Sequence, residues 1–179
     1  MKNASQKIIL FEEPDPSIER QCEWDEPKGF MFGGMSMLTE ASLSQVAEQY
    51  FNAAKALLLI IRNNEVADYE LQNPVFYLFR QTMELLIKAV LLAEGKSILE
   101  NKKYLHTLQI LLGRLDNVPV DFQSLIQQLN EIDPKSTLLR YGGPKLYFNG
   151  EMWCSLNKLE YQMERLYQYL TNRLNGKPK

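Results

Sequence analysis

One helical period constrains this chain of 179 residues more than any other feature of its sequence. Between Pro74 and Glu94 the polar residues are few, and an advance of about 100° per residue places all but one of them within an arc of roughly 140°. Thr82 falls outside that arc, which holds Arg80, Gln81, Glu84, Lys88 and Glu94. Because the rest of its surface is apolar, we expect this helix at the centre of a bundle or against another subunit.

The ends of this helix and of the one before it are marked by capping residues. Asn73 is a good N-cap, Pro74 suits the first helical position, and Gly95 suits a left-handed residue after the last turn. An earlier amphipathic helix runs from about residue 36 to Arg62. Three residues are candidates for the N-cap of this helix. Ser42 forms a pattern with Gln45 that resembles a capping box, and Ser36 and Thr39 are the alternatives.

Three further apolar stripes follow at steps of three and four residues. We expect a short helix from near His106 to Leu115 and a fourth from Pro119, stopped by Asp133 before Pro134. A last helix covers about residues 151–174 and carries a heptad-like seam suited to packing in a bundle.

These elements predict an all-α protein, an up-and-down bundle of about five helices in residues 37–175. Residues 1–36 are rich in proline and glycine, so we expect an extended N-terminal arm, and residues 176–179 a disordered tail. We expect residues 134–150 to have no regular secondary structure. One short β pairing, between residues 8–11 and 145–148, is left open.

Composition excludes several classes of function. The net charge is −2, which provides no broad basic field, so general binding of duplex nucleic acid is not expected. One histidine and two distant cysteines do not build a typical zinc site, and we expect neither metal nor cofactor. The first residues lack the apolar run of a signal peptide, and no stretch is long enough to cross a bilayer, so we expect no membrane association and a cytoplasmic protein.

Three segments resemble the helical core of the HEPN superfamily. Residues 73–92 look like its second helix, which often carries Arg, then Glu-Leu and Lys, here Arg80, Glu84-Leu85 and Lys88. Residues 105–108 (Leu-His-Thr-Leu) resemble its His-x-Leu helix start, and residues 130–141 the Asp, Ser and Arg-Tyr segment of a bacterial branch. The resemblance covers about half of the chain.

The resemblance implies a bundle of about five helices, usually dimeric, in prokaryotic defence or toxin–antitoxin systems. Some members are metal-independent ribonucleases, and others are non-catalytic partners of a minimal nucleotidyltransferase. The ribonucleases share an Arg four to six residues before a His. Before His106 this chain has Leu99, Glu100, Asn101 and Lys102 instead, which argues against that activity.

Arg80, Glu84 and Lys88 are the first candidate site residues, because their spacing stacks them along one helix face. They can form one wall of a polar pocket in which Arg80 or Lys88 holds an anionic ligand and Glu84 orients them or acts as a base. Alternatively they form a solvated charge ladder, or a partly buried ion-pair network that fixes packing.

His106, Arg140 and Tyr141 are the other candidates. His106 can act as a base or bind phosphate, or it is a helix-entry histidine bonded to the backbone or to Glu84. In a loop, Arg140 can clamp phosphate or carboxylate, or tie that loop to Asp133 or Glu84.

The sequence is compatible with three functions. The first is a non-catalytic binding module, a homodimer, with a polar pocket for a nucleotide-like or other anionic ligand or for a partner protein. The second is an atypical metal-independent ribonuclease or toxin that uses His106 and Arg140. The third is a purely structural interaction protein in which the charged stripe does no chemistry.

Overall fold

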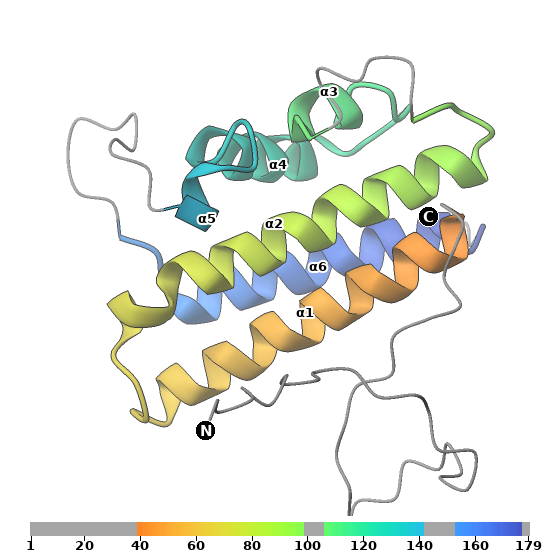
Figure 1. Cartoon of the computed structure of the whole chain (residues 1–179). Helices are drawn as coiled ribbons and strands as arrows, with labels where there is room; N and C mark the ends of the chain where they lie inside the picture. The colour runs from red at the N-terminus through yellow and green to blue at the C-terminus, as the bar shows by residue number, and fades with distance from the viewer. Residues whose placement is uncertain (1–38, 99–105, 142–152, 177–179) are drawn as a thin grey trace, which may run out of the picture. The chain divides into compact units, whose positions relative to one another are not determined.

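The computed structural model describes residues 39–98, 106–141 and 153–176, all within one unit of the chain, residues 37–179. These residues form helices joined by short segments (Figure 1). The helices are α1 (Glu40–Arg62), α2 (Asp68–Ala93), α3 (Leu108–Leu112), α4 (Val120–Ile132), α5 (Leu138–Tyr141) and α6 (Leu156–Leu174). The prediction of an all-α bundle is confirmed for the described part of the chain.

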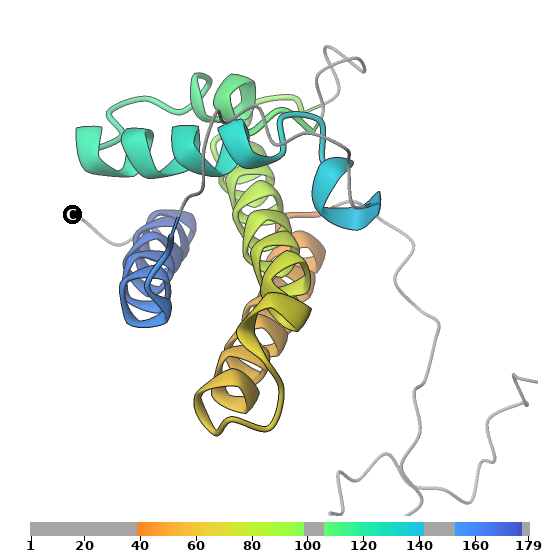
Figure 2. The ribbon, with the colours of Figure 1, turned by 90° about the vertical axis from the view of Figure 1, so that its left-hand side faces the viewer.

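Helix α2 is the central element, as predicted. It contacts α1 and α6 along one side and α3 and α5 along the other. Figures 1 and 2 show the three long helices α1, α2 and α6 as one layer, with α3, α4 and α5 as a second. Every functional candidate is therefore either on α2 or on the second layer that covers it.

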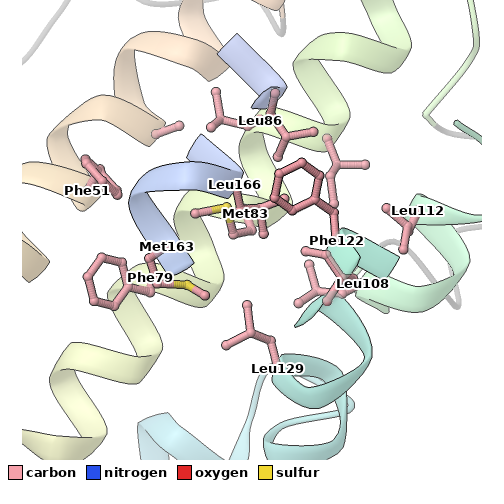
Figure 3. Packing of buried hydrophobic residues seen from close by; sticks show 14 of the residues in the cluster. Phe51, Phe79, Met83, Leu86, Leu108, Leu112, Phe122, Leu129, Met163 and Leu166 are labelled. Carbon is pink, nitrogen blue, oxygen red and sulfur yellow. The ribbon is translucent and has the colours of Figure 1, made fainter. Parts of the chain in front are cut away.

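The core follows from the apolar stripes (Figure 3). Phe51 of α1 packs edge-on against Phe79 of α2, with ring centroids 5.8 Å apart, and stacks on Tyr167 of α6 at 4.1 Å. Residues of the second layer close the core from the other side, among them Leu108, Leu112, Phe122, Ile126 and Leu129. Burial of these side chains is the main force that holds the two layers together.

Helix α1 begins with a reciprocal cap at Thr39, one of the three predicted positions. The hydroxyl of Thr39 accepts from the Ser42 amide at 3.1 Å, and the Ser42 hydroxyl accepts from the Thr39 amide at 3.0 Å. Serine therefore replaces the usual Glu or Gln of a capping box.

The predicted start of α2 at Asn73 and Pro74 is wrong, because the helix begins at Asp68 and Pro74 lies inside it. A proline there removes the hydrogen bond to the carbonyl of Glu70. Glu70 is exposed, so water can solvate that carbonyl and the helix continues.

The predicted end of α2 is confirmed. Gly95 has φ +71° and follows the C-cap Glu94. Its amide donates to the Leu92 carbonyl at 2.9 Å, and the Lys96 amide donates to the Leu91 carbonyl at 2.8 Å. These two bonds make a Schellman motif, which needs a left-handed residue at this position.

Other predicted boundaries are corrected by the structure. Helix α3 is a single short turn, and α6 begins at Leu156 after Ser155 rather than near residue 151. Within the segment expected to be irregular, residues 138–141 form α5. The fourth helix ends before Asp133, as predicted.

Several predictions lie outside the described residues: the N-terminal arm, the β pairing of residues 8–11 with 145–148, and the end of the tail at residues 177–179. Among the residues that are described, no helix has both the length and the apolar character needed to span a membrane.

Gly95→Ala should lower the free energy of unfolding by about 1–2 kcal/mol, because a left-handed conformation strains any residue with a Cβ. Nothing lies within 4 Å of the added methyl group, so the cost is one of backbone conformation alone. The matched control is Gly113→Ala, since Gly113 has φ −61° and an added Cβ would meet only the carbonyls of Gln109 at 3.4 Å and Ile110 at 3.6 Å, which are ordinary van der Waals contacts. Urea unfolding should show it unchanged or slightly stabilised. Equal losses in the two variants would contradict this prediction.

Candidate functional site

On the polar face of α2, Arg80, Glu84 and Lys88 form a buried ion-pair network and not a solvated ladder. The side chains of Arg80, Glu84 and Lys88 are 1%, 2% and 10% exposed. Arg80 and Lys88 each lie four residues from Glu84, which brings all three onto one face. Of the structural alternatives predicted for these residues, the structure shows the buried network.

Arg80 connects three parts of the unit through its guanidinium group. Nη1 donates to Glu84 Oε2 at 2.9 Å, which closes the pair within α2. Nε donates to the backbone carbonyl of Asp133 at 3.0 Å, and Nη2 to that of His106 at 2.5 Å. One buried side chain therefore ties the entry to α3 and the end of α4 to α2.

Glu84 is the acceptor at the centre of this network. Its Oε1 accepts from Lys88 Nζ at 2.7 Å and lies 2.7 Å from Nδ1 of His106, while Oε2 accepts from Arg80. Burial alone would raise the pKa of this carboxyl group, but the charge and hydrogen bond of Lys88, the hydrogen bond of His106 and the charge of Arg80 lower the pKa overall. Glu84 is therefore a carboxylate in the folded protein.

His106 stands at the entry to α3 with an exposed ring. Its side chain is 63% exposed although its partner Glu84 is buried. One of the two predicted roles, a helix-entry histidine bonded to Glu84, is therefore present, and it leaves the other edge of the ring toward solvent. Among the described residues no hydrogen-bond partner is found for Nε2.

Arg140 and Tyr141 lie on the short helix α5 instead of in a loop. Arg140 does not bond to Asp133 or Glu84, the two partners expected for it; both Nε, at 2.7 Å, and Nη2 donate to the carbonyl of Ser136. Its guanidinium carbon lies 6.0 Å from the ring centre of Tyr77 and 5.4 Å from that of Tyr141. The Tyr141 side chain is 76% exposed.

Asp133 is the residue whose role the sequence did not reveal. Its carboxylate is fully buried and accepts from the amides of Thr137 at 2.7 Å and Leu138 at 3.0 Å, which orders the start of α5. Asp before Pro134 is a signal for a turn, but nothing local indicates that Arg80 would bind its carbonyl. Gln81 adds a second tether, donating to the Ser136 hydroxyl at 2.7 Å.

Tyr77 marks the position of Arg140 along α2, because its ring centre lies 6.0 Å from the guanidinium carbon of Arg140. Burial, and after it the nearby Tyr50, raises the pKa of Tyr77, whereas the charge of Arg140 acts in the opposite direction. Tyr77 and Glu84 are seven residues apart on α2, about 10 Å along the helix axis.

The structure thus unites Arg80, Glu84, Lys88 and His106 in one hydrogen-bonded cluster and places Arg140 and Tyr141 about two turns away on the same side of α2. No group of metal-ligating side chains is present among residues 39–98, 106–141 and 153–176. Comparison with models of protein families, with curated proteins and with solved structures finds no match for this chain.

The network predicts a loss of stability in acid. The folded-state pKa of Glu84 is below its ordinary value of 4.5, so its contribution is fully present above pH 4.5 and is lost as pH falls through the lowered pKa. Urea unfolding at a series of pH values from 7 to 3 should show this decline. In Glu84→Gln the free energy of unfolding should already be reduced at neutral pH and should depend less on pH.

Asp116→Asn is the control for this pH series. The pKa of Asp116 is also lowered, by its hydrogen bond to Lys96, but this carboxyl group is fully exposed. The acid loss should persist in Asp116→Asn. Its disappearance in that variant, or equal stability of the wild type at pH 6 and pH 3, would contradict the assignment to Glu84.

Proposed function

We propose that this chain is a non-catalytic, HEPN-like helical binding module that takes an anionic, nucleotide-like ligand beside His106 and Arg140. One observation carries the proposal: the buried guanidinium of Arg80 holds the carbonyls of both His106 and Asp133. Asp133 in turn orders α5, which carries Arg140. Two exposed groups from separate segments are therefore held in place by the same buried side chain, and such preorganisation lowers the cost of binding.

The buried charged groups already have hydrogen-bond partners within the protein, so we expect the exposed groups to contact the ligand. All three nitrogens of Arg80 donate to protein acceptors, and both oxygens of Glu84 accept from protein donors. Arg80 and Glu84 are thus positioning residues in this proposal, and Lys88 balances the charge of Glu84.

Arg140 supplies the anion contact. A guanidinium group is a planar donor that suits phosphate or carboxylate, and here it lies next to the exposed ring of Tyr141. Nε and Nη2 of Arg140 donate to the Ser136 carbonyl, so in this proposal Nη1 makes the main contact with the anion. Exposed aromatic rings stack on bases in a way that tolerates any base. The pairing of Arg140 with Tyr141 therefore favours a nucleotide-like ligand over a simple anion.

The resemblance supplies the wider setting of the proposal: a cytoplasmic homodimer in a bacterial defence or toxin–antitoxin system, with a nucleotidyltransferase as its partner protein. A purely structural role for the charged face is the competing hypothesis for the buried residues. A purely structural role does not explain why His106 and Arg140 are held in exposed positions.

An atypical metal-independent ribonuclease is the second candidate, and the bond between Glu84 and His106 favours it. A carboxylate that orients an imidazole is the arrangement found in many acid–base sites. Arg140 would then stabilise the charge on a phosphate group.

Isothermal titration of the full chain with adenosine monophosphate tests the first proposal. Arg140→Ala removes a charge-assisted hydrogen bond worth roughly 1.5–3 kcal/mol, so Kd should rise about tenfold or more. The charge-matched control is Lys55→Ala, which breaks a half-exposed pair with Glu164 and a cation–π contact with Phe51, both away from Arg140, and should bind as the wild type does.

Absence of binding by the wild type, or equal weakening in the Arg140 and Lys55 variants, would contradict the binding proposal. Incubation of the same preparations with single-stranded RNA separates the two candidates. Cleavage by the wild type that is lost in His106→Ala would replace the binding module with the ribonuclease.

A further inference from the structure

The orientation of the His106 ring defines which of its nitrogens meets a ligand. Nδ1 lies 2.7 Å from Glu84 Oε1, and the same carboxylate also accepts from Lys88 and Arg80. A carboxylate that already accepts from the side chains of Arg80 and Lys88 accepts hydrogen bonds and does not donate them. Nδ1 must therefore carry the proton in this contact.

The tautomer of a histidine is set by the hydrogen bond that one of its nitrogens makes. With the proton on Nδ1, the neutral ring presents Nε2 as a bare acceptor, on a side chain that is 63% exposed. An acceptor is the wrong partner for an anionic oxygen but suits a hydroxyl or amino group.

We propose that Glu84 is a positioning residue that fixes neutral His106 in the Nδ1–H form, so that the site selects ligands with both a hydrogen-bond donor and an anionic group. The donor meets Nε2 of His106 and the anion meets Arg140. This deepens the proposed function and rests on it for the ligand, whereas the state of the ring can be measured without any ligand. Arg140 lies next to Tyr77 and His106 lies next to Glu84. Tyr77 and Glu84 are about 10 Å apart along α2, so a ligand that meets both groups must be extended.

The chain contains one histidine, so its ring nitrogens give unambiguous signals in long-range ¹H–¹⁵N NMR spectra. The full chain, free of any histidine tag, should show a protonated Nδ1 and an unprotonated Nε2 in the neutral ring. Lys88→Met keeps the contact between Glu84 and His106 and should preserve this pattern. Glu84→Asp keeps the negative charge but shortens the side chain, so the ring should sample both tautomers.

A proton on Nε2 in the wild type, or averaging between both tautomers, would overturn the positioning role whether or not the variants fold. Titration with three probes then tests the ligand: adenosine monophosphate has the anion and distant donors, adenosine has the donors without the anion, and inorganic phosphate has the anion but is too short to reach from Arg140 to Nε2 of His106. Adenosine monophosphate should bind at least tenfold more tightly than either of the others and should shift the Nε2 signal.

The possible failures are distinguishable. If the Nδ1–H form is found but no probe binds, the proposed function and the ligand selection fall while the positioning role stands. If inorganic phosphate binds as tightly as adenosine monophosphate, the selection for a donor is wrong although an anion site exists.

Discussion

The guanidinium of Arg80 lies in the interior of the helical unit, where a charged group without hydrogen-bond acceptors would be very costly. Glu84 satisfies one nitrogen from within α2, but the other two need acceptors from elsewhere in the chain. The backbone carbonyls of His106 and Asp133 supply them. The position of the second layer on α2 is thus specified by a polar requirement in addition to apolar packing.

This arrangement explains why ionised groups are present in a core that is mostly apolar. A buried ion pair often contributes less to stability than apolar residues of the same volume would, because both charges lose their hydration. Its value here lies in geometry, since apolar side chains alone would permit α3 and α5 to slide along α2. Fixed positions for His106 and Arg140 are what a binding site requires.

Much of the fold could be predicted from the sequence because helical periodicity is local. The apolar stripes located the long helices, and the narrow polar arc identified α2 as central. Pro74 misled the prediction because the helix starts six residues earlier, at Asp68, and solvent compensates for the lost hydrogen bond. Helix α5 was missed because its order depends on the buried carboxylate of Asp133, and burial of that residue depends on contacts between distant segments.

The candidate site was predicted in part. Spacing placed Arg80, Glu84 and Lys88 on one face, and the bond between Glu84 and His106 was among the alternatives. Sequence could not show that Arg80 is occupied by two backbone carbonyls, because both acceptors are main-chain atoms that carry no sequence signal. For the same reason it could not separate the buried positioning residues from the exposed ones.

Amide hydrogen exchange in Arg80→Lys tests most directly whether one guanidinium holds both exposed segments. Lysine keeps the charge beside Glu84 but lacks the fork that reaches the carbonyls of His106 and Asp133. Exchange should become faster at Leu111 in α3 and at Leu138 in α5, while amides in α1 and α6 remain as protected as in the wild type. Unchanged protection in α3 and α5, or an equal loss in every helix, would contradict the account.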